Sequence, residues 1–319
     1  MNNTAVMTGR FSGPFTALLK REFLEGKNYY FWLPVILLGG VLTLFFLMAI
    51  GFGSVIEIGS MEVKNIYNLG SALERAQERD PVELPAAITA MYWLMAGPAA
   101  VTIPFVVFFS LLGALYEERR DRSVLFWKSM PVSDWQEVLA KLLVPVLGTL
   151  FLFLGAVIAM QLLTAILLSL IVLLQGGPIS ALWPLGLMVT SWVTAAVVIL
   201  LYTLWALPVF AWILLVSAYA PRMPFVYAML PPTVVVVVEA VFFETGNLLS
   251  FLGRHLGGWM GDFFANIHID SPRDLITLLF GGGYFRAFGG ALTNMDFWVG
   301  LLIGALFLAG AVELRKRSV

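Results

Sequence analysis

Long uncharged apolar runs alternate with short charged stretches along this chain. Residues 28–56 and 84–116 carry no charged side chain, and residues 142–221 continue uncharged for eighty positions. A membrane-crossing helix needs roughly 20 mostly apolar residues. The first two runs therefore predict one span each. The third run is long enough for two spans, and the glycine pair and proline at 176–178 mark the break between them.

Two further apolar runs follow, so the pattern predicts six transmembrane helices in an all-α integral membrane fold. We place the spans at about residues 30–53, 89–115, 142–173, 183–217, 223–243 and 297–312. Longer loops cover residues 54–88 and 244–296. In the second loop, regularly spaced leucines and a Ser-Pro start predict short helices resting on the outer leaflet. A folded cap that touches no substrate explains these helices equally well.

The basic residues give the chain an orientation. If the N-terminus lies in the cytoplasm, thirteen of the 19 Lys and Arg residues fall in cytoplasmic segments, and the outer loops hold the other six. Cytoplasmic loops carry an excess of Lys and Arg. We therefore expect both termini in the cytoplasm, with residues 54–88 and 244–296 outside and the whole chain forming a single transmembrane domain.

An amphipathic segment at about residues 13–28 precedes the first span. Its apolar side chains recur at helical spacing, and charged residues occupy the remaining positions. The apolar positions are Phe15, Leu18, Leu19 and Phe23. This pattern predicts a helix lying in the inner membrane interface. The alternative is a frayed, charged flank of the first span.

Composition agrees with a membrane protein and excludes several functions. The chain of 319 residues is 60% hydrophobic and 12% charged, against about 25% charged residues in a soluble domain. A net charge of -1 leaves no basic face for nucleic acid. No cysteine is present, which removes disulfides and thiolate metal sites. A membrane hydrolase needs a nucleophile with a base, or a metal cluster, within its spans. The predicted spans contain no histidine or aspartate, which argues against intramembrane catalysis.

The most polar stretch between two spans runs over residues 116–141 and also contains the bulky run Leu125, Phe126 and Trp127. Pro131 disfavours helix at the residue before it. Ser133 then caps a second helix with Gln136 three positions on. The layout predicts a compact knob below the bilayer. Two interpretations remain: the aromatic residues bind a partner, or they sit among lipid headgroups, where aromatic residues are common.

This stretch resembles the cytoplasmic segment between the second and third spans of the ABC type-2 exporter permeases. The Glu118-Arg119 pair matches the start of the family pattern, and Ser123 matches its hydroxyl position. The turn and the following helix match at Pro131-Val132-Ser133, Glu137 and Lys141. The family has a glycine before the hydroxyl residue, where this chain has Arg122. Six spans, an amphipathic first helix and a long loop between spans five and six extend the resemblance.

The resemblance implies a coupling helix at about residues 121–130 that docks onto a separate ATP-binding subunit. It assigns the contact to Glu118, Arg119, Arg122, Ser123, Leu125, Phe126, Trp127, Lys128 and Pro131. This chain has no G-x-x-x-x-G-K-[ST] phosphate loop. It is therefore not expected to be an enzyme or to hold a cofactor. ATP and Mg²⁺ are expected in two partner ATPase subunits.

The resemblance further implies a transporter core of two permease chains, a homodimer more readily than a heterodimer, in a bacterial cytoplasmic membrane. The apolar spans favour export of a lipid-like molecule, an amphipathic peptide or a hydrophobic drug. Alternatives are an ATP-driven pump for a small ion or a glycan, and a membrane scaffold or sensor subunit that transports nothing.

Three residues of the fifth span are candidates for a pathway or gate. Pro231 and Pro232 remove two amide donors and are expected to kink or break the helix. Glu239 is an ionisable residue in a span, a position that often has a function. It is also close enough to the outer headgroups to reach them, which is the simpler explanation. We expect no metal site at the scattered pairs His255, Asp262, His268 and Asp270.

Overall fold

The structure is a computed structural model, and it describes residues 8–51, 56–58, 61–63, 66–128, 132–258, 274, 289–290 and 292–317. Its first half contains α1 (Thr8–Glu25), η1 (Asn28–Trp32), α2 (Leu33–Gly51), β1 (Ile56–Ile58), β2 (Met61–Val63), η2 (Ile66–Asn68), α3 (Leu69–Arg79), α4 (Glu83–Leu94), α5 (Gly97–Ala114), α6 (Tyr116–Arg120) and α7 (Val124–Lys128). Its second half contains α8 (Asp134–Leu143), η3 (Val144–Gly148), α9 (Thr149–Leu174), η4 (Ile179–Leu182), α10 (Leu185–Trp205), α11 (Leu207–Tyr219), α12 (Pro224–Phe242), α13 (Asn247–Gly253), η5 (Arg254–Gly258) and α17 (Met295–Arg317).

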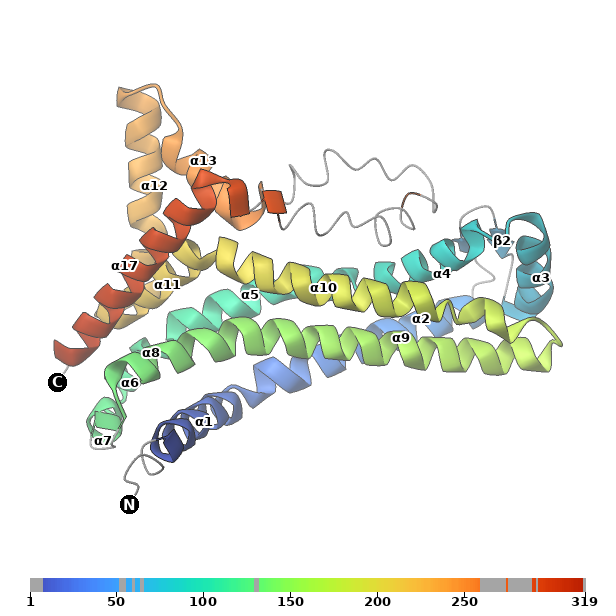
Figure 1. Ribbon diagram of the computed structural model, residues 1–319, viewed down its shortest axis with the longest axis horizontal. Helices are drawn as coiled ribbons and strands as arrows, with labels where there is room; N and C mark the ends of the chain where they lie inside the picture. The colour runs from blue at the N-terminus through green and yellow to red at the C-terminus, as the bar shows by residue number, and fades with distance from the viewer. Residues whose placement is uncertain are drawn as a thin grey trace, which may run out of the picture.

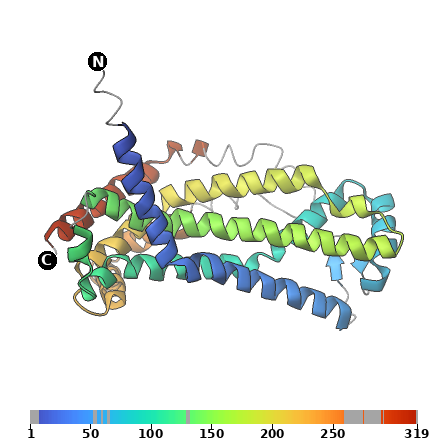
Figure 2. The same ribbon diagram turned by 90° about the horizontal axis from the view of Figure 1, so that it is seen from below.

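Helices α2, α5, α9 and α10 lie side by side along the long axis of the molecule (Figures 1 and 2). At one end, α1 and the short helices α6, α7 and α8 gather near the last turn of α17. At the other end, α3 and the small antiparallel hairpin β1–β2 cover the bundle. This hairpin is the one departure from an all-helical chain among the described residues. Helix α12 stands at a steep angle to the bundle.

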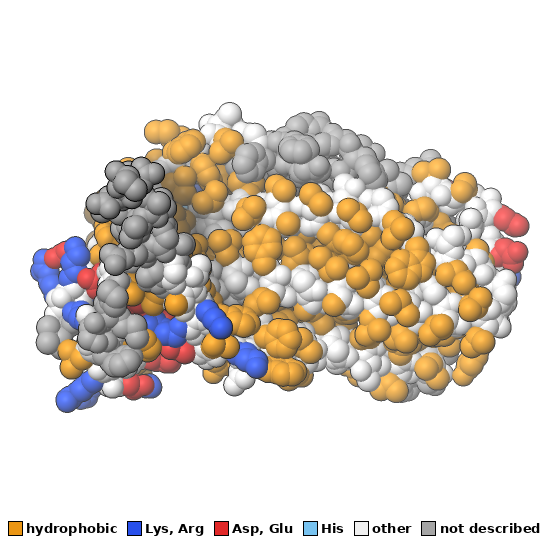
Figure 3. All heavy atoms as spheres, turned by 60° about the horizontal axis from the view of Figure 1, so that its bottom comes forward, with side chains coloured by type: hydrophobic (Ala, Val, Ile, Leu, Met, Phe, Trp, Pro, Cys, Tyr) orange, Lys and Arg blue, Asp and Glu red, His pale blue; other side chains and the backbone are white. Residues whose placement is uncertain are grey.

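In the described part of the chain, six helical stretches are long and apolar enough to cross a membrane, as the sequence predicts. They are Asn28–Ile50, Glu83–Arg120, Asp134–Leu174, Ile179–Trp205, Pro224–Phe242 and Met295–Arg317. Apolar side chains cover most of the face in Figure 3, and charged side chains gather at its two ends. The chain is therefore a multi-pass helical membrane protein.

The fourth predicted span, at about 183–217, divides into two helices. Helix α10 ends at Trp205 and α11 begins at Leu207, with Ala206 between them. Pro208 is the second residue of α11, where its missing amide costs no helical hydrogen bond. Inside one continuous helix its ring would clash with the carbonyl of Leu204. The break therefore follows from a proline inside an otherwise uniform apolar run.

The proline pair in α12 does not break the helix, which runs without interruption from Pro224 to Phe242. Pro232 has no N–H to donate to the Ala228 carbonyl four residues earlier. The indole N–H of Trp212 on α11 donates to that carbonyl instead, at 3.0 Å. Neighbouring helices commonly satisfy backbone groups that proline leaves free in membrane proteins. The expected break does not occur, and a tertiary hydrogen bond satisfies one of the two carbonyls that the proline pair leaves free.

Helices α11 and α17 form the most extensive helix–helix contact. Glycine allows this close approach: a Cβ atom on Gly304 would lie 2.8 Å from the Leu207 side chain. Small residues at helix interfaces let backbones pack closely in membranes. Gly300 leaves space in the same way for the ring of His255, which is fully buried.

At the opposite end, the N-terminal turn of α3 packs against the C-terminus of α9 through Gln175. Its side-chain oxygen accepts from the Gly70 amide at 2.7 Å, and its amide donates to the Ile66 carbonyl at 2.8 Å. Gly177 lies so close to Gly70 that an added Cβ would be 2.5 Å from the Gly70 Cα. The Gln-Gly-Gly turn between two spans therefore also holds the covering helix α3.

Candidate functional site: a buried charge network

Six charged side chains from four helices meet at the polar end of the bundle. They are Arg21 and Glu22 on α1, Glu118 on α6, Glu137 and Lys141 on α8, and Arg315 on α17. Three are cations and three are anions, so the charges of these six side chains balance, and the more exposed Glu25 and Asp134 pair with Arg21 and Arg315 at the edge. Charged side chains are almost never fully buried unless they are paired. The set is therefore held together by mutual neutralisation.

Lys141 lies at the centre and is only 2% exposed. Its Nζ is 2.9 Å from Glu118 Oε1 and 3.1 Å from Glu22 Oε1. The second oxygen of Glu118 accepts from Arg315 Nη1 at 2.9 Å. A single carboxylate, Glu118, thus connects the helix that follows the second span to α8 and to the end of α17.

Arg21 closes the network from the side of α1. Its guanidinium pairs with Glu22 and Glu137, and lies 3.3 Å from Glu118 Oε1. The guanidinium carbon also lies 4.0 Å from the centre of the Trp127 ring, a cation–π contact. Burial alone would lower the pKa of Arg21, but the charges and hydrogen bonds of Glu22 and Glu137 outweigh it and raise that pKa. Arg21 therefore stays charged.

Oxygens of Glu22, Glu118 and Glu137 lie within 4.8 Å of one another, a spacing that suits a metal ion. Each of these three carboxylates already contacts a cationic side chain, however, so their charges are compensated by the protein itself. The arrangement is therefore an ion-pair network and not a metal site. Its capability is mechanical, because it ties four helices to one another.

Arg119 forms a second set of interhelical hydrogen bonds beside the network. Its Nη2 donates to the carbonyls of Ser217 and Ala220 at 2.8 and 2.9 Å, at the C-terminal end of α11. In return, the Ser217 hydroxyl accepts from the amides of Leu115 and Tyr116 at 2.9 and 3.0 Å. A cation at a helix C-terminus also interacts favourably with the helix dipole. The Glu118-Arg119 pair thus fixes the segment to α8, α17 and α11 together.

Arg122 adopts a left-handed backbone conformation, with φ of 59°. This is the position where the resembling family has glycine, which reaches positive φ without steric cost. The side chain is exposed. The chain therefore keeps the bend that the glycine would give, at the expense of local strain. Next to it, the Ser123 hydroxyl points at the Glu118 carbonyl, 3.4 Å away.

Replacing Arg122 by glycine is expected to raise the free energy of unfolding by about 1 kcal/mol, because it removes the left-handed penalty. Thermal unfolding in detergent measures the change. Arg120→Gly serves as the control, since Arg120 is also exposed but helical, and glycine there should lower stability by about 1 kcal/mol. Equal effects of the two changes would show that the bend at Arg122 is not strained.

The short helix α7 carries the residues predicted to meet a partner, and their environments differ. Leu125 is 53% exposed. Trp127 is partly buried and its ring faces Arg21. Lys128 is exposed, and its Nζ donates to the Lys316 carbonyl at 3.1 Å. The side chain of Phe126 and all of Pro131 lie outside the described part of the structure. The contacts of Trp127 and Lys128 join α7 to the chain's own α1 and α17.

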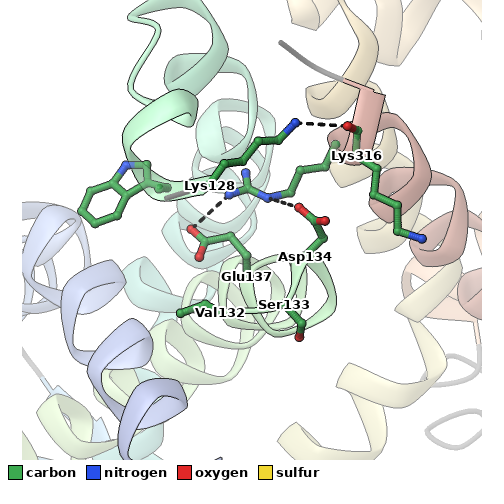
Figure 4. Close-up of a pocket in the computed structure, with 8 residues that line it drawn as sticks. Lys128, Val132, Ser133, Asp134, Glu137 and Lys316 are labelled. Atoms are coloured by element: carbon green, nitrogen blue, oxygen red, sulfur yellow. Dashed lines mark hydrogen bonds and ion pairs between the residues drawn. The ribbon is translucent and has the colours of Figure 1, made fainter. Parts of the chain in front are cut away.

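A cavity of about 290 Å³ lies between α7, the start of α8 and the end of α17 (Figure 4). It is lined by Trp127, Lys128, Val132, Ser133, Asp134, Glu137, Arg315 and Lys316. Ser133 and Gln136 form the capping box expected from the sequence, which fixes the start of α8 beside the cavity. Asp134 and Glu137 face Arg315, with carboxylate oxygens 3.4 and 3.7 Å from its guanidinium nitrogens. The cavity thus opens onto one side of the network.

The candidate gate residues have structural partners. Glu239 Oε2 accepts from the Leu248 amide at 2.8 Å, which caps the first turn of α13. Pro231 and Pro232 lie within continuous α12. His255 Nδ1 lies 2.8 Å from the Phe251 carbonyl. Asp262, His268, Asp270 and the remaining predicted loop helices lie outside the described residues.

The sequence pattern indicated Glu118, Glu137 and Lys141 as motif residues, and the structure brings all three together. It did not indicate Arg21, Glu22 or Arg315. The sequence pattern places Arg21 and Glu22 on the charged face of the amphipathic segment, and Arg315 in the basic stretch that ends the chain. One weak feature of the sequence could have indicated these residues. They are charged side chains next to opposite charges, within helices that are otherwise amphipathic or apolar.

Comparison with known proteins gives no further assignment. The chain matches no family model and no curated protein, and its structure matches no solved structure. The site is therefore interpreted from its own residues. What these residues build is a neutral, buried ion-pair network at one end of a multi-pass helical membrane protein.

Proposed function

We propose that this chain is the membrane-spanning permease subunit of an ATP-driven exporter, with residues 116–141 coupling it to a separate ATPase. The observation that carries the proposal is the buried network around Glu118 and Lys141. It joins the polar segment between the second and third spans to α1 and α17. Three of the residues by which this chain resembles the ABC type-2 permeases, Glu118, Glu137 and Lys141, belong to the network.

The network suits a coupling role for a physical reason. Removing any one partner from a buried ion pair leaves an uncompensated charge and costs about 3–5 kcal/mol. The helices that contribute the partners are therefore expected to move as one body. A force applied to α7 and α8 from the cytoplasm would displace α1 and α17 along with the second and third spans, instead of bending a loop.

The proposed complex contains two permease chains, a homodimer more readily than a heterodimer, and two cytoplasmic ATPase subunits that bind ATP and Mg²⁺. Both termini and residues 116–141 lie on the cytoplasmic side of a bacterial inner membrane. The substrate is lipid-like, an amphipathic peptide or a hydrophobic drug, because the spans are apolar and almost free of charge. Exposed Leu125 offers an apolar contact for the ATPase.

Purification of the chain with its native partners tests the proposal. We expect an ATPase subunit in the complex, with ATP hydrolysis that depends on the permease. Leu125→Ser should weaken the complex about ten-fold, as loss of a moderate interface contact does. Met223→Ser is the matched control, since Met223 is an exposed apolar residue outside the segment. Absence of any ATPase partner from the purified complex would reject the proposed function.

A further inference from the structure

The α1–α2 junction exposes a stripe of alternating basic and apolar side chains. Lys20, Leu24, Lys27 and Phe31 follow one another at helical spacing and all are exposed. The chain stays helical through Lys27, with φ of -49° and ψ of -37°. In an α-helix, residues four and seven positions apart share one face. Phe31 follows Lys27 by four positions in the π-helical turn Asn28–Trp32, whose wider turn keeps residues four apart on nearly the same side. The stripe is therefore a continuous surface that runs from α1 into the first span.

The opposite stripe is buried and fixes the orientation of the junction. Leu18, Glu22 and Tyr30 are 5%, 7% and 6% exposed. The Tyr30 ring lies directly over Gly26, where an added Cβ would be 2.1 Å from a ring carbon. With Tyr30 turned inwards, its neighbour Tyr29 faces outwards and is 62% exposed. The junction therefore presents a defined outer face with a fixed order of side chains.

The two lysines of this face have no carboxylate partner among the described residues. At the same end Arg120 pairs with Asp121, and Lys316 with Glu313. Exposed Arg122 also has no carboxylate partner among the described residues, but it lies in the turn after α6, outside this stripe. In Figure 3, basic side chains lie directly against the apolar surface near this end. Two ammonium groups beside exposed leucine and aromatic side chains are thus left for a ligand that is both anionic and apolar.

We propose that the stripe Lys20–Leu24–Lys27–Phe31 is a binding site for an anionic phospholipid. Lys20 and Lys27 are about 10 Å apart along the helix, and their long side chains can converge on one phosphate. Leu24 and Phe31 contact the acyl chains below it. Lysine stems cover apolar surface while their charged ends reach the headgroups, and aromatic side chains favour the same depth. A soluble anion would use only half of this surface.

The proposed lipid site and the charge network lie on opposite sides of α1. Arg21 and Glu22 follow Lys20 directly on the same helix and form the α1 side of the network. A lipid that holds α1 in place therefore favours the assembled network, and the assembled network favours lipid binding by the same factor. The lipid thus stabilises the whole polar end of the protein. The inference holds whether or not the chain couples to an ATPase.

Full-length protein in vesicles and nanodiscs of phosphatidylcholine, with and without phosphatidylglycerol, provides the test. Mass spectrometry of the intact protein measures retained lipid, and thermal unfolding measures stability. We expect preferential retention of phosphatidylglycerol and a higher melting temperature in its presence. Each lysine near an anionic surface contributes about five-fold in affinity. The Lys20→Gln, Lys27→Gln double variant should therefore lose the preference about 25-fold, together with the lipid-dependent rise in melting temperature.

The controls separate this site from general electrostatics and from misfolding. Lys20→Arg with Lys27→Arg keeps the charges and should keep the preference. Arg222→Gln removes an exposed cation elsewhere and should leave lipid retention unchanged. A glutamine double variant that retains phosphatidylglycerol like the wild type overturns the proposal. The proposal is also overturned if Arg222→Gln loses as much phosphatidylglycerol retention as the glutamine double variant. Competition by inorganic phosphate at a concentration equal to that of the lipid overturns it as well.

Discussion

Replacing Lys141 by methionine is expected to lower the free energy of unfolding by about 3–5 kcal/mol. Lys141 is 2% exposed, and its ammonium group contacts the carboxylates of Glu22 and Glu118. Methionine fills a similar volume but leaves both carboxylates without this partner in a buried setting. The loss comes from the charges that remain, not from the methionine itself. Chemical unfolding in mixed micelles measures it directly.

The matched control for this change is Lys316→Met. Lys316 belongs to the same end of the molecule and pairs with Glu313, but its side chain is 51% exposed. Exposed ion pairs contribute about 0–1 kcal/mol, so this variant should stay close to the wild type. If Lys141→Met were equally mild, the ammonium group of Lys141 would not be held in a buried network, and the coupling argument would lose its basis.

A second variant tests whether neutrality stabilises the cluster. Lys141→Met combined with Glu22→Gln removes one cation and one anion, so the remaining four charges balance again. We expect the double variant to be more stable than the sum of the single changes predicts, by about 1–3 kcal/mol, as for residues in direct contact. Simple additivity would show that Glu22 and Lys141 act independently.

The spans could be predicted because each depends on a local property. A long uncharged apolar run can cross a membrane only as a helix or within a closed barrel, because its backbone groups need partners inside the bilayer. All six predicted spans overlap long apolar helices. The capping box at Ser133 was predictable for the same reason, since its partner Gln136 lies only three residues away. The break at Ala206 does not follow from hydropathy, because the chain around Pro208 is uniformly apolar on both sides.

The network could not be predicted in this way, because its partners are distant in the chain. Arg21 and Glu118 are separated by 97 positions, and Glu118 and Arg315 by 197. Sequence periodicity places Glu22 on the polar face of α1 together with Lys20, yet Glu22 is buried inside the protein while Lys20 stays exposed. Trp127 shows the same limit: an aromatic residue in a charged loop predicts a partner, and the partner it contacts is Arg21 of its own chain.

Replacing Gly177 by alanine is expected to lower the free energy of unfolding by about 1–3 kcal/mol, the usual cost of forcing extra atoms into a packed site. The added methyl group would lie 2.5 Å from the Gly70 Cα and 3.0 Å from Val172 Cγ1. The nearest neighbour is backbone and cannot rotate away. Helix α3 must therefore move, which separates Gly70 from Gln175 and breaks their hydrogen bond.

Limited trypsin digestion reports this movement separately from global stability, because α3 contains Arg75 and ends at Arg79. We expect faster cleavage there in Gly177→Ala, together with a lower melting temperature. Gly155→Ala in the same helix α9 is the control, since no atom lies within 4 Å of its added Cβ, and alanine there should stabilise the helix by about 1 kcal/mol. Unchanged cleavage in Gly177→Ala would mean that α3 is not held through the contact between Gly70 and Gly177. A loss of stability without faster cleavage would instead place the strain within α9, because α3 would have kept its position while the end of α9 gave way.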